Sequence, residues 1–267
     1  MKNKDIEDFY QNGFLHIRGL APHDECEDAE QQVWQYLPGE RDDPSTWPEG
    51  GNQPWRHWFG DGNVWQIYEK YIDPIFNALV GEGLHDQGLT LAEKASPIVT
   101  FPSKDKEWSV GGPHVDQHGP IHRTQVLGAL VYLHDVPKEA GSTVVWPGIF
   151  RELEDMSVEH KKLTCDLLNR DHLFELKSEP VVHDFKTGDA LIIHRSTPHA
   201  GSANTSERPR VALQYHAHLN AEGEWHCRTK QEPRTVIERN YDRHFDEYLL
   251  FNYFGCRPKN TWDEEKK

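Results

Sequence analysis

His114 and Asp116 are the first residues whose types and spacing could do chemistry. They follow a Gly-Gly-Pro run, and only Val115 separates them. Side chains of an extended strand alternate between its two faces, so an imidazole and a carboxylate at this spacing lie on the same face. Both groups bind metal ions. Because a His-x-Asp triplet is common by chance, it indicates a metal site only if further ligands join it.

A second segment supplies a third ligand and a cation. A Gly-Asp turn precedes an apolar run that ends at His194, and Pro198-His199 follows it. Arg210 begins the next predicted strand, eleven residues after His199. At the mouth of a barrel of strands both side chains face inward. We therefore expect His199 and Arg210 to lie in one pocket with His114 and Asp116.

These four residues together predict one kind of chemistry. Two imidazoles and one carboxylate on one face of a metal ion leave three positions open, the arrangement of non-haem Fe(II) oxygenases. The open positions can take a bidentate 2-oxo acid such as 2-oxoglutarate, and O₂. An arginine deeper in the pocket can bind the far carboxylate of that cosubstrate through a two-pronged, charge-assisted pair.

Other side chains compete for these roles. His118 has the strand parity of His114, but a Gly-Pro pair follows it directly, and His194 ends its own strand before the loop. Arg208 is the rival of Arg210, and Pro209 separates the two. His216 and His218 form a further pair, which a cupin-type metal-binding protein without oxygenase activity would use together with His114 and His118.

The elements that position these residues fall into two parts. The N-terminal part reads as mainly helical, with a helix that ends at Asn12-Gly13, a strand over 14–17, a helix from Asp24, and a helix over 63–81 bent or restarted at Pro74. From Leu89 onward the chain has short β runs at 89–101, 124–136, 142–146, 179–185, 190–194 and 210–219, separated by turn residues. This series predicts an antiparallel barrel or sandwich.

Three further segments surround this β series. A helix is expected over 150–168, and an aromatic-rich helix over 236–254. The segment 38–62 is rich in Pro, Gly, Asp and Trp, and it is long for a loop in a compact domain. It can be a lid over the pocket or a loop packed on the body by its own aromatic side chains.

Composition excludes several classes of function. The 29 Lys+Arg against 44 Asp+Glu give a formal charge of −15, which repels a phosphate backbone, and no basic stripe for nucleic acid is present. No apolar run approaches the roughly 20 residues of a membrane span. The N-terminus lacks the apolar region of a secretory signal, so we expect a cytoplasmic protein. Histidine is abundant, at 17 of 267 residues, which favours metal chemistry.

The segments that carry this pattern also carry a resemblance. They are His114-Val115-Asp116, the strand 130–136 leading to Gly141-Ser142-Thr143 and Trp146-Pro147-Gly148, and the stretch 188–213. On these segments the chain resembles the phytanoyl-CoA dioxygenase family of Fe(II)/2-oxoglutarate-dependent oxygenases. The resemblance implies a mainly β fold with flanking helices, a double-stranded β-helix of the jelly-roll, cupin-like type.

The resemblance also implies a division of the chain and roles for its residues. Together with the chain length and the helical segments at both ends, it predicts one domain over 1–267, with a helical part over 1–85, a jelly-roll core over 88–220 and a helical extension over 230–256. Iron would be held by His114, Asp116 and His199, and 2-oxoglutarate by Arg210 and Thr143. Residues near the predicted pocket edges could contact a small-molecule substrate: Trp55, Arg56, His122, Arg123 and Trp146.

The reaction implied is oxidation of an unactivated C–H bond while 2-oxoglutarate is decarboxylated to succinate and CO₂. Related halogenases replace the carboxylate ligand by Gly or Ala, so the presence of Asp116 favours hydroxylation. Desaturation, epoxidation or cyclisation in a biosynthetic pathway use the same ligands and remain alternatives. The sequence indicates neither the substrate nor an oligomeric state.

Overall fold

The structure is a computed structural model of the chain. It describes residues 3–53, 57–80, 89–90, 95–103, 107–116, 125–160, 164, 167–168 and 173–219. The predicted C-terminal extension over 230–256 and its helix therefore lie outside the described residues. The division of the chain into a single domain with three parts stays a prediction.

The N-terminal elements follow the sequence prediction closely. Helix α1 (Asn3–Asn12) ends at Gly13, and β1 (Phe14–Ile17) follows directly. Gly13 has φ +81°, and a Cβ atom there would lie 2.3 Å from Oγ1 of Thr197. This turn therefore requires glycine for its backbone conformation and for its close approach to the later chain.

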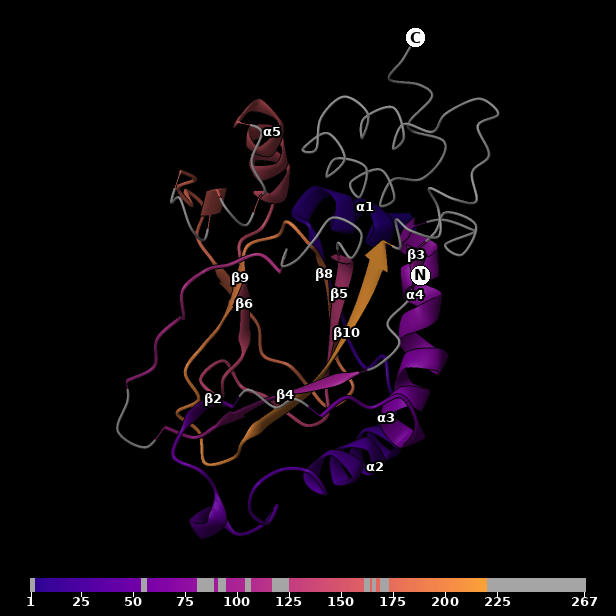
Figure 1. Ribbon diagram of the computed structural model, residues 1–267, viewed down its shortest axis with the longest axis vertical. Coiled ribbons are helices and arrows are strands. Elements are labelled where there is room, and N and C mark those ends of the chain that lie inside the picture. Colours follow the sequence, from indigo (N-terminus) through magenta and orange to yellow (C-terminus); the bar gives the residue numbers. More distant parts are fainter. Residues whose placement is uncertain are drawn as a thin grey trace.

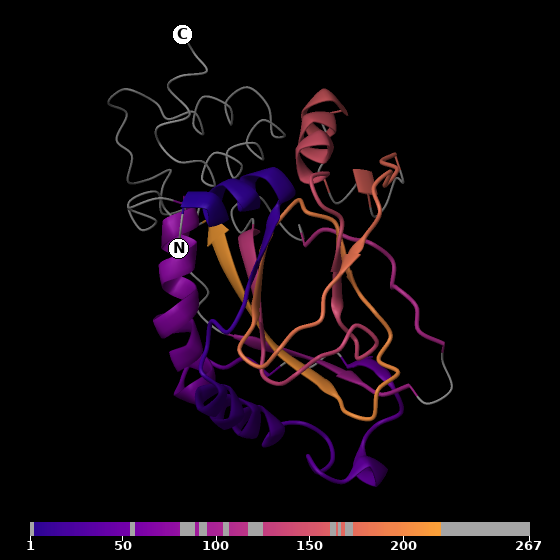
Figure 2. The same cartoon turned by 180° about the vertical axis from the view of Figure 1, so that it is seen from behind.

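A second group of helices covers one face of the larger sheet. These are α2 (His23–Trp34), α3 (Gly62–Ile67), a π-helical turn (Tyr68–Ile72) and α4 (Asp73–Val80). Pro74 is the second residue of α4, directly after the π-helical turn, in which the backbone N–H of Asp73 donates to the carbonyl oxygen of Tyr68. Figures 1 and 2 show these indigo and purple helices along the outer side of β10 and β4. The helix thus changes type just before Pro74 without a break in the run of helical residues, and the predicted bend there stays a prediction.

The larger sheet is antiparallel and has the order β1-β8-β5-β10-β4-β2, with β3 also paired to β10. Its remaining strands are β2 (Gly51–Gln53), β3 (Leu89–Thr90), β4 (Ser96–Phe101), β5 (Gln125–Tyr132), β8 (Ala190–His194) and β10 (Arg210–Leu219). The bounds of β8 and β10 are those predicted. The run predicted over 89–101 forms two strands, β3 and β4.

The smaller sheet faces the larger one and has the order β7-β6-β9. Its strands are β6 (Thr143–Val145), β7 (Val181–Val182) and β9 (His199–Gly201), and α5 (Phe150–His160) follows β6. Bridges from Val110 to Ser202 and from His114 to His199 add the segment 107–116 to its edge. His199 was expected in the connection after β8, whereas the structure gives it a short strand of its own.

Alternation along the strands separates the interior from the two outer faces. On β10, Val211, Leu213 and Tyr215 belong to the cluster under the helices, whereas Ala212 faces the space between the sheets. On the smaller sheet, Val115 and Ala200 pack outward with Leu153 of α5. Both sheets therefore have a covered outer face and a shared interior, as a jelly roll requires. The predicted fold class is confirmed.

The segment 38–62 is packed on the body in its described part. It contains a 3₁₀ turn (Pro44–Thr46) and β2, which pairs with β4. The Trp47 ring lies 6.2 Å from the ring of Phe101, and Phe59 is buried and bridged to Ala95. Of the two interpretations, a lid over the pocket or a loop packed on the body by its own aromatic side chains, the second describes these residues.

Among the described residues, no helix combines the length and apolar character needed to cross a membrane.

Candidate metal centre and cosubstrate pocket

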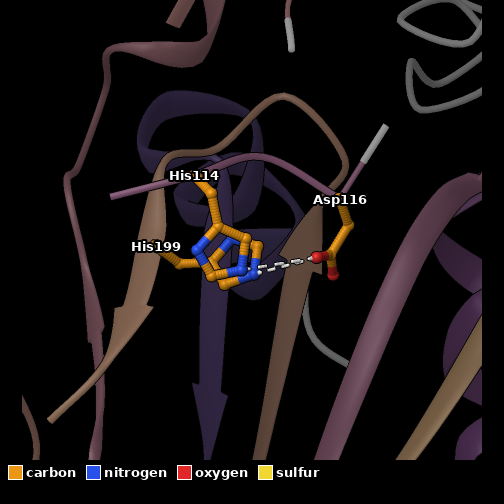
Figure 3. Close-up of side chains that lie close together, drawn as sticks. All are labelled: His114, Asp116 and His199. Atoms are coloured by element: carbon orange, nitrogen blue, oxygen red, sulfur yellow. Dashed lines mark ion pairs between the residues drawn. The ribbon is translucent and has the colours of Figure 1, made fainter. Parts of the chain in front are cut away.

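Three side chains from two adjacent strands converge at the edge of the smaller sheet. His114 and His199 face each other across the bridge, each donating its backbone N–H to the carbonyl of the other at 2.9 Å. Asp116 follows two residues after His114, and the buried Val115 between them points to the opposite side. Figure 3 shows both imidazoles directed toward the Asp116 carboxylate.

The ligand atoms of this group lie close enough to share one ion. Oδ1 of Asp116 is 3.4 Å from Nε2 of His199 and 3.7 Å from Nε2 of His114. One ligand atom from each of the three residues lies within 4.8 Å of the others. The geometry therefore brings together the three residues that the sequence predicted as metal ligands.

Backbone carbonyls orient both imidazoles. Nδ1 of His199 lies 3.0 Å from the carbonyl oxygen of Thr197, and Nδ1 of His114 lies 3.4 Å from that of Gly112. Because a carbonyl only accepts hydrogen bonds, Nδ1 carries the proton in each ring. Each Nε2 is thereby turned toward Asp116 with a lone pair available for a cation.

The electrostatics of the site favour a cation. Burial alone would raise the pKa of Asp116, but the charge of His199, with smaller contributions from His216 and His114, holds it well below its ordinary value. Burial would lower the pKa of His199, yet Asp116 raises it overall. The carboxylate therefore stays ionised and attracts positive charge, which a proton or a divalent metal ion can supply.

Arg210 lies in the interior, at the first residue of β10. It is 2% exposed, and its Nη2 donates to Oγ1 of Thr100 at 2.8 Å. Tyr132 also hydrogen-bonds to the guanidinium, and its hydroxyl donates to Oγ1 of Thr143 at 2.8 Å. Burial lowers the pKa of Arg210, which the hydroxyl of Tyr132 partly opposes. Within the described residues, Nε of Arg210 has no hydrogen-bond partner.

This arrangement suits a carboxylate. A buried guanidinium is costly unless an anion or several acceptors surround it, and here the described neighbours are neutral hydroxyl groups. Sequence reasoning did not single out Thr100 and Tyr132. The pairing of Arg210 with Thr100 and of Ala212 with Tyr132 across the sheet brings them to the arginine. Strand parity alone does not identify these cross-strand neighbours.

The rival residues take other places. Nη2 of Arg208 donates to both carboxylate oxygens of Glu30, at 2.8 and 2.9 Å, and half of its side chain is exposed. His194 is fully buried against the rings of Phe9 and Phe150. His194 thus packs beside α1 and α5, outside the group of ligand atoms.

The histidine pair on β10 is only partly described. His216 lies near enough to Asp116 to lower the pKa of that carboxyl, but it is outside the group of ligand atoms. His118 and the side chain of His218 lie outside the described residues.

Most of the predicted substrate contacts also lie outside the described residues, namely Trp55, Arg56, His122 and Arg123. Trp146 is described and is 7% exposed, within the apolar cluster that covers the outer face of the smaller sheet. Its burial there gives it a packing role, and contact with a substrate stays a prediction.

Comparison with known proteins gives a family and a set of similar folds. The family model described as phytanoyl-CoA dioxygenase (PhyH) matches residues 9–212. No curated protein matches the sequence significantly.

Three solved structures illustrate the similar folds. The carbocyclase SnoK from nogalamycin biosynthesis has a TM-score of 0.54 at 16% identity and covers 88% of this chain and 94% of its own. EvdO2 from Micromonospora carbonacea var. aurantiaca, complexed with 2-oxoglutarate, has a TM-score of 0.58 at 17% identity, covering 82% and 91%. HygX from Streptomyces hygroscopicus with iron bound has a TM-score of 0.52 at 16% identity, covering 83% and 88%. At such low identity these likenesses show the fold.

Proposed function

The chain belongs to the phytanoyl-CoA dioxygenase family, and on this premise we propose that it hydroxylates an unactivated C–H bond of a small-molecule metabolite. It is a non-haem iron enzyme that depends on 2-oxoglutarate. In the proposed reaction, substrate, O₂ and 2-oxoglutarate give hydroxylated product, succinate and CO₂. The observation that carries the proposal is the convergence of His114, Asp116 and His199 on one point.

The donor set fits iron. Two imidazole nitrogens and one carboxylate oxygen form a facial group, which is the ligand type of non-haem Fe(II) oxygenases. We assign His114, Asp116 and His199 as the ligands. When bound, Fe(II) supplies the activation of O₂ and the oxidising power for the C–H bond. The protein's own contribution is to hold the ligands, orient the reactants and exclude water.

The Arg210 cluster fits the far carboxylate of 2-oxoglutarate. The guanidinium supplies charge and parallel N–H donors, and the hydroxyls of Thr100, Tyr132 and Thr143 add neutral hydrogen-bonding groups around it. Thr143 lies two residues before Val145, which pairs with His199, so both β6 residues face the interior with the metal centre. The proposed iron site and Thr143 thus lie on the smaller sheet, and Arg210, Thr100 and Tyr132 lie on the larger sheet across the shared interior.

The interior between the two sheets is apolar. Leu130, Val145, Leu191 and Ile193 line the space between the sheets and are buried. An apolar wall strengthens the attraction between Arg210 and a carboxylate, because the effective dielectric constant is low there. It also limits the access of water to reactive species.

Asp116 favours hydroxylation over halogenation, because the carboxylate takes the coordination position that a halide would need. The same fold also supports reactions other than hydroxylation. Similar structures include the carbocyclase SnoK and the epimerase SnoN, both described as dependent on α-ketoglutarate. We therefore keep desaturation, epoxidation and cyclisation as the second candidate function.

Proteins of similar fold support a small-molecule substrate. HygX has been crystallised with hygromycin B, and SnoN with nogalamycin RO. The competing hypothesis of a cupin-type protein without oxygenase activity is disfavoured by the family match. Its proposed ligand His216 also lies outside the group of ligand atoms in the described residues.

An anaerobic titration tests the proposed function. Fe(II) and 2-oxoglutarate added to the protein should give a visible charge-transfer band that neither produces alone. A panel of candidate metabolites should then contain one that stimulates succinate release in air. A protein that binds Zn²⁺ tightly but gives no such band with Fe(II) and 2-oxoglutarate would contradict the proposal.

A further inference from the structure

The connection between β8 and β9 carries a buried polar cluster that the proposed reaction does not use. Arg195, Ser196 and Glu154 are 1%, 0% and 2% exposed. Oγ of Ser196 donates to Oε1 of Glu154 at 2.7 Å, and Nη2 of Arg195 lies 3.4 Å from the same oxygen. Glu154 comes from α5, so the cluster joins this helix to the connection.

Burying such a cluster is costly. Desolvation of two charged groups commonly offsets much of their attraction, so a buried ion pair is weak evidence for a gain in stability. Burial raises the pKa of Glu154 to about 7, although Arg195 and Ser196 oppose the shift. Within the described residues, Oε2 of Glu154 has no hydrogen-bond partner. An apolar residue would fill this place at lower cost if packing were its only purpose.

The cluster leads directly to a proposed iron ligand. Ser196 is followed by Thr197, whose carbonyl oxygen accepts from Nδ1 of His199 at 3.0 Å. The Thr197 hydroxyl donates to the carbonyl of Gly13 at 2.7 Å, and the backbone N–H of Trp146 donates to the carbonyl of Pro198 at 3.0 Å. The connection that orients the imidazole is thus held from α5, from the α1–β1 turn and from the end of β6.

We propose that Glu154 is a positioning residue for the metal centre, which holds Ser196 and through it the Thr197 carbonyl that aims the His199 imidazole. This proposal rests on the proposed function, because it takes His199 as a ligand. It assigns a role to α5, which lies in the segment between β6 and β7 and whose described side chains contribute no ligand.

Metal binding tests this role without a substrate. We compare wild type, Glu154→Ala, Glu154→Gln and Ser196→Ala by titration with Co(II), whose visible spectrum reports both affinity and coordination geometry. Loss of an interaction that orients a ligand typically weakens metal binding 10–100-fold. We expect Glu154→Ala to show a loss in this range with an altered spectrum. Glutamine keeps a side-chain oxygen that can accept the hydrogen bond from Ser196. The Co(II) affinity of Glu154→Gln should therefore lie within about threefold of wild type.

Leu153→Ala is the matched control. Leu153 is the preceding residue of α5 and is fully buried in the apolar cluster with Val115 and Ala200. Its truncation destabilises the same helix and its packing behind the ligands, and it leaves the groups of the Glu154–Ser196 hydrogen bond in place. This variant should lose thermal stability and keep wild-type Co(II) affinity and spectrum. If Glu154→Ala does not fold, Ser196→Ala decides, with an expected loss of about threefold to tenfold.

The experiment separates failure of the Glu154 role from failure of the ligand assignment. Unchanged Co(II) affinity and spectrum in Glu154→Ala, or in Ser196→Ala where that variant decides, overturn the role of Glu154 and leave the iron site intact. An equal loss of affinity in Leu153→Ala also overturns it, because general loosening of α5 then explains the effect. A wild-type protein that binds no Co(II) overturns the ligand assignment itself, and the positioning role with it.

Discussion

At the scale of single residues, the chemistry depends on groups that are costly to bury. Asp116 and His199 shift each other's pKa in opposite directions, and each shift favours the charged form of the group. Arg210 is buried among hydroxyls with Nε unpaired within the described residues. Such groups are retained where a ligand compensates the cost, which is why these two clusters together point to a metal ion and a carboxylate cosubstrate.

Replacement of Arg210 tests the cosubstrate site. Arg210→Ala should weaken 2-oxoglutarate binding by about 1.5–3 kcal/mol, the scale of a lost charged hydrogen bond, while the affinity for Fe(II) alone is retained. The charge-transfer band measured against 2-oxoglutarate concentration gives both quantities. Arg208→Ala is the control, because Arg208 pairs with Glu30 instead. Wild-type dependence on 2-oxoglutarate in Arg210→Ala would mean that another cation binds the cosubstrate.

At the scale of elements, the site is assembled where connections meet. The α1–β1 turn, α5 and the end of β6 all contact the short connection before β9. The turn at Gly13 shows how little space this assembly leaves for an added atom. Its Cβ position lies 2.3 Å from Oγ1 of Thr197 and 2.6 Å from the ring of Phe150. A single methyl group there requires movement of the residue that orients His199.

Gly13→Ala should therefore destabilise the fold strongly. A left-handed backbone conformation costs a non-glycine residue about 1–2 kcal/mol, and overpacking adds about 1–3 kcal/mol. Gly19→Ala is the matched control, because Gly19 also has positive φ, at +57°, but nothing lies within 4 Å of its Cβ position. Denaturant unfolding should show a clearly larger loss for Gly13→Ala. Equal losses would show that strain alone, without the contact to Thr197, limits this turn.

At the scale of the whole molecule, the buried His194 and the half-buried His183 link stability to pH. Burial lowers the pKa of His194 well below 6.5, and it lowers that of His183 to about 4. Below pH 6.5 the unfolded chain therefore takes up protons that the folded protein does not. The free energy of unfolding must then fall on acidification, by up to about 1.4 kcal/mol per pH unit for the fully buried His194 and by less for the partly exposed His183.

His194→Gln isolates one of these contributions. Glutamine can accept the backbone N–H of Ser196, as Nδ1 of His194 does at 3.3 Å, but it does not titrate. Denaturant unfolding of both proteins between pH 7 and pH 4.5 should give a shallower decline for the variant, with the two curves converging in acid. Because His183 is present in both, the difference belongs to His194. Parallel curves would contradict a neutral, buried His194.

Local pattern in the sequence determined the ligand types, their strand parity and many element bounds. Alternation placed His114 and Asp116 on one face with Val115 opposite, and turn residues marked the start of β10 at Arg210. The bounds of β1 and β8 were predicted from the same kind of turn residues. These features depend on neighbours within a few residues, so they can be read from the chain directly.

Only the tertiary structure decided which distant residues meet. Arg210 meets Thr100 and Tyr132 through sheet register, and Glu154 reaches Ser196 through the packing of α5. His199 pairs with His114 because its short strand joins the smaller sheet. A shift of one residue in any register would turn these side chains to the opposite face. Register is selected by the burial of the whole sheet, and no local stretch of sequence carries that information.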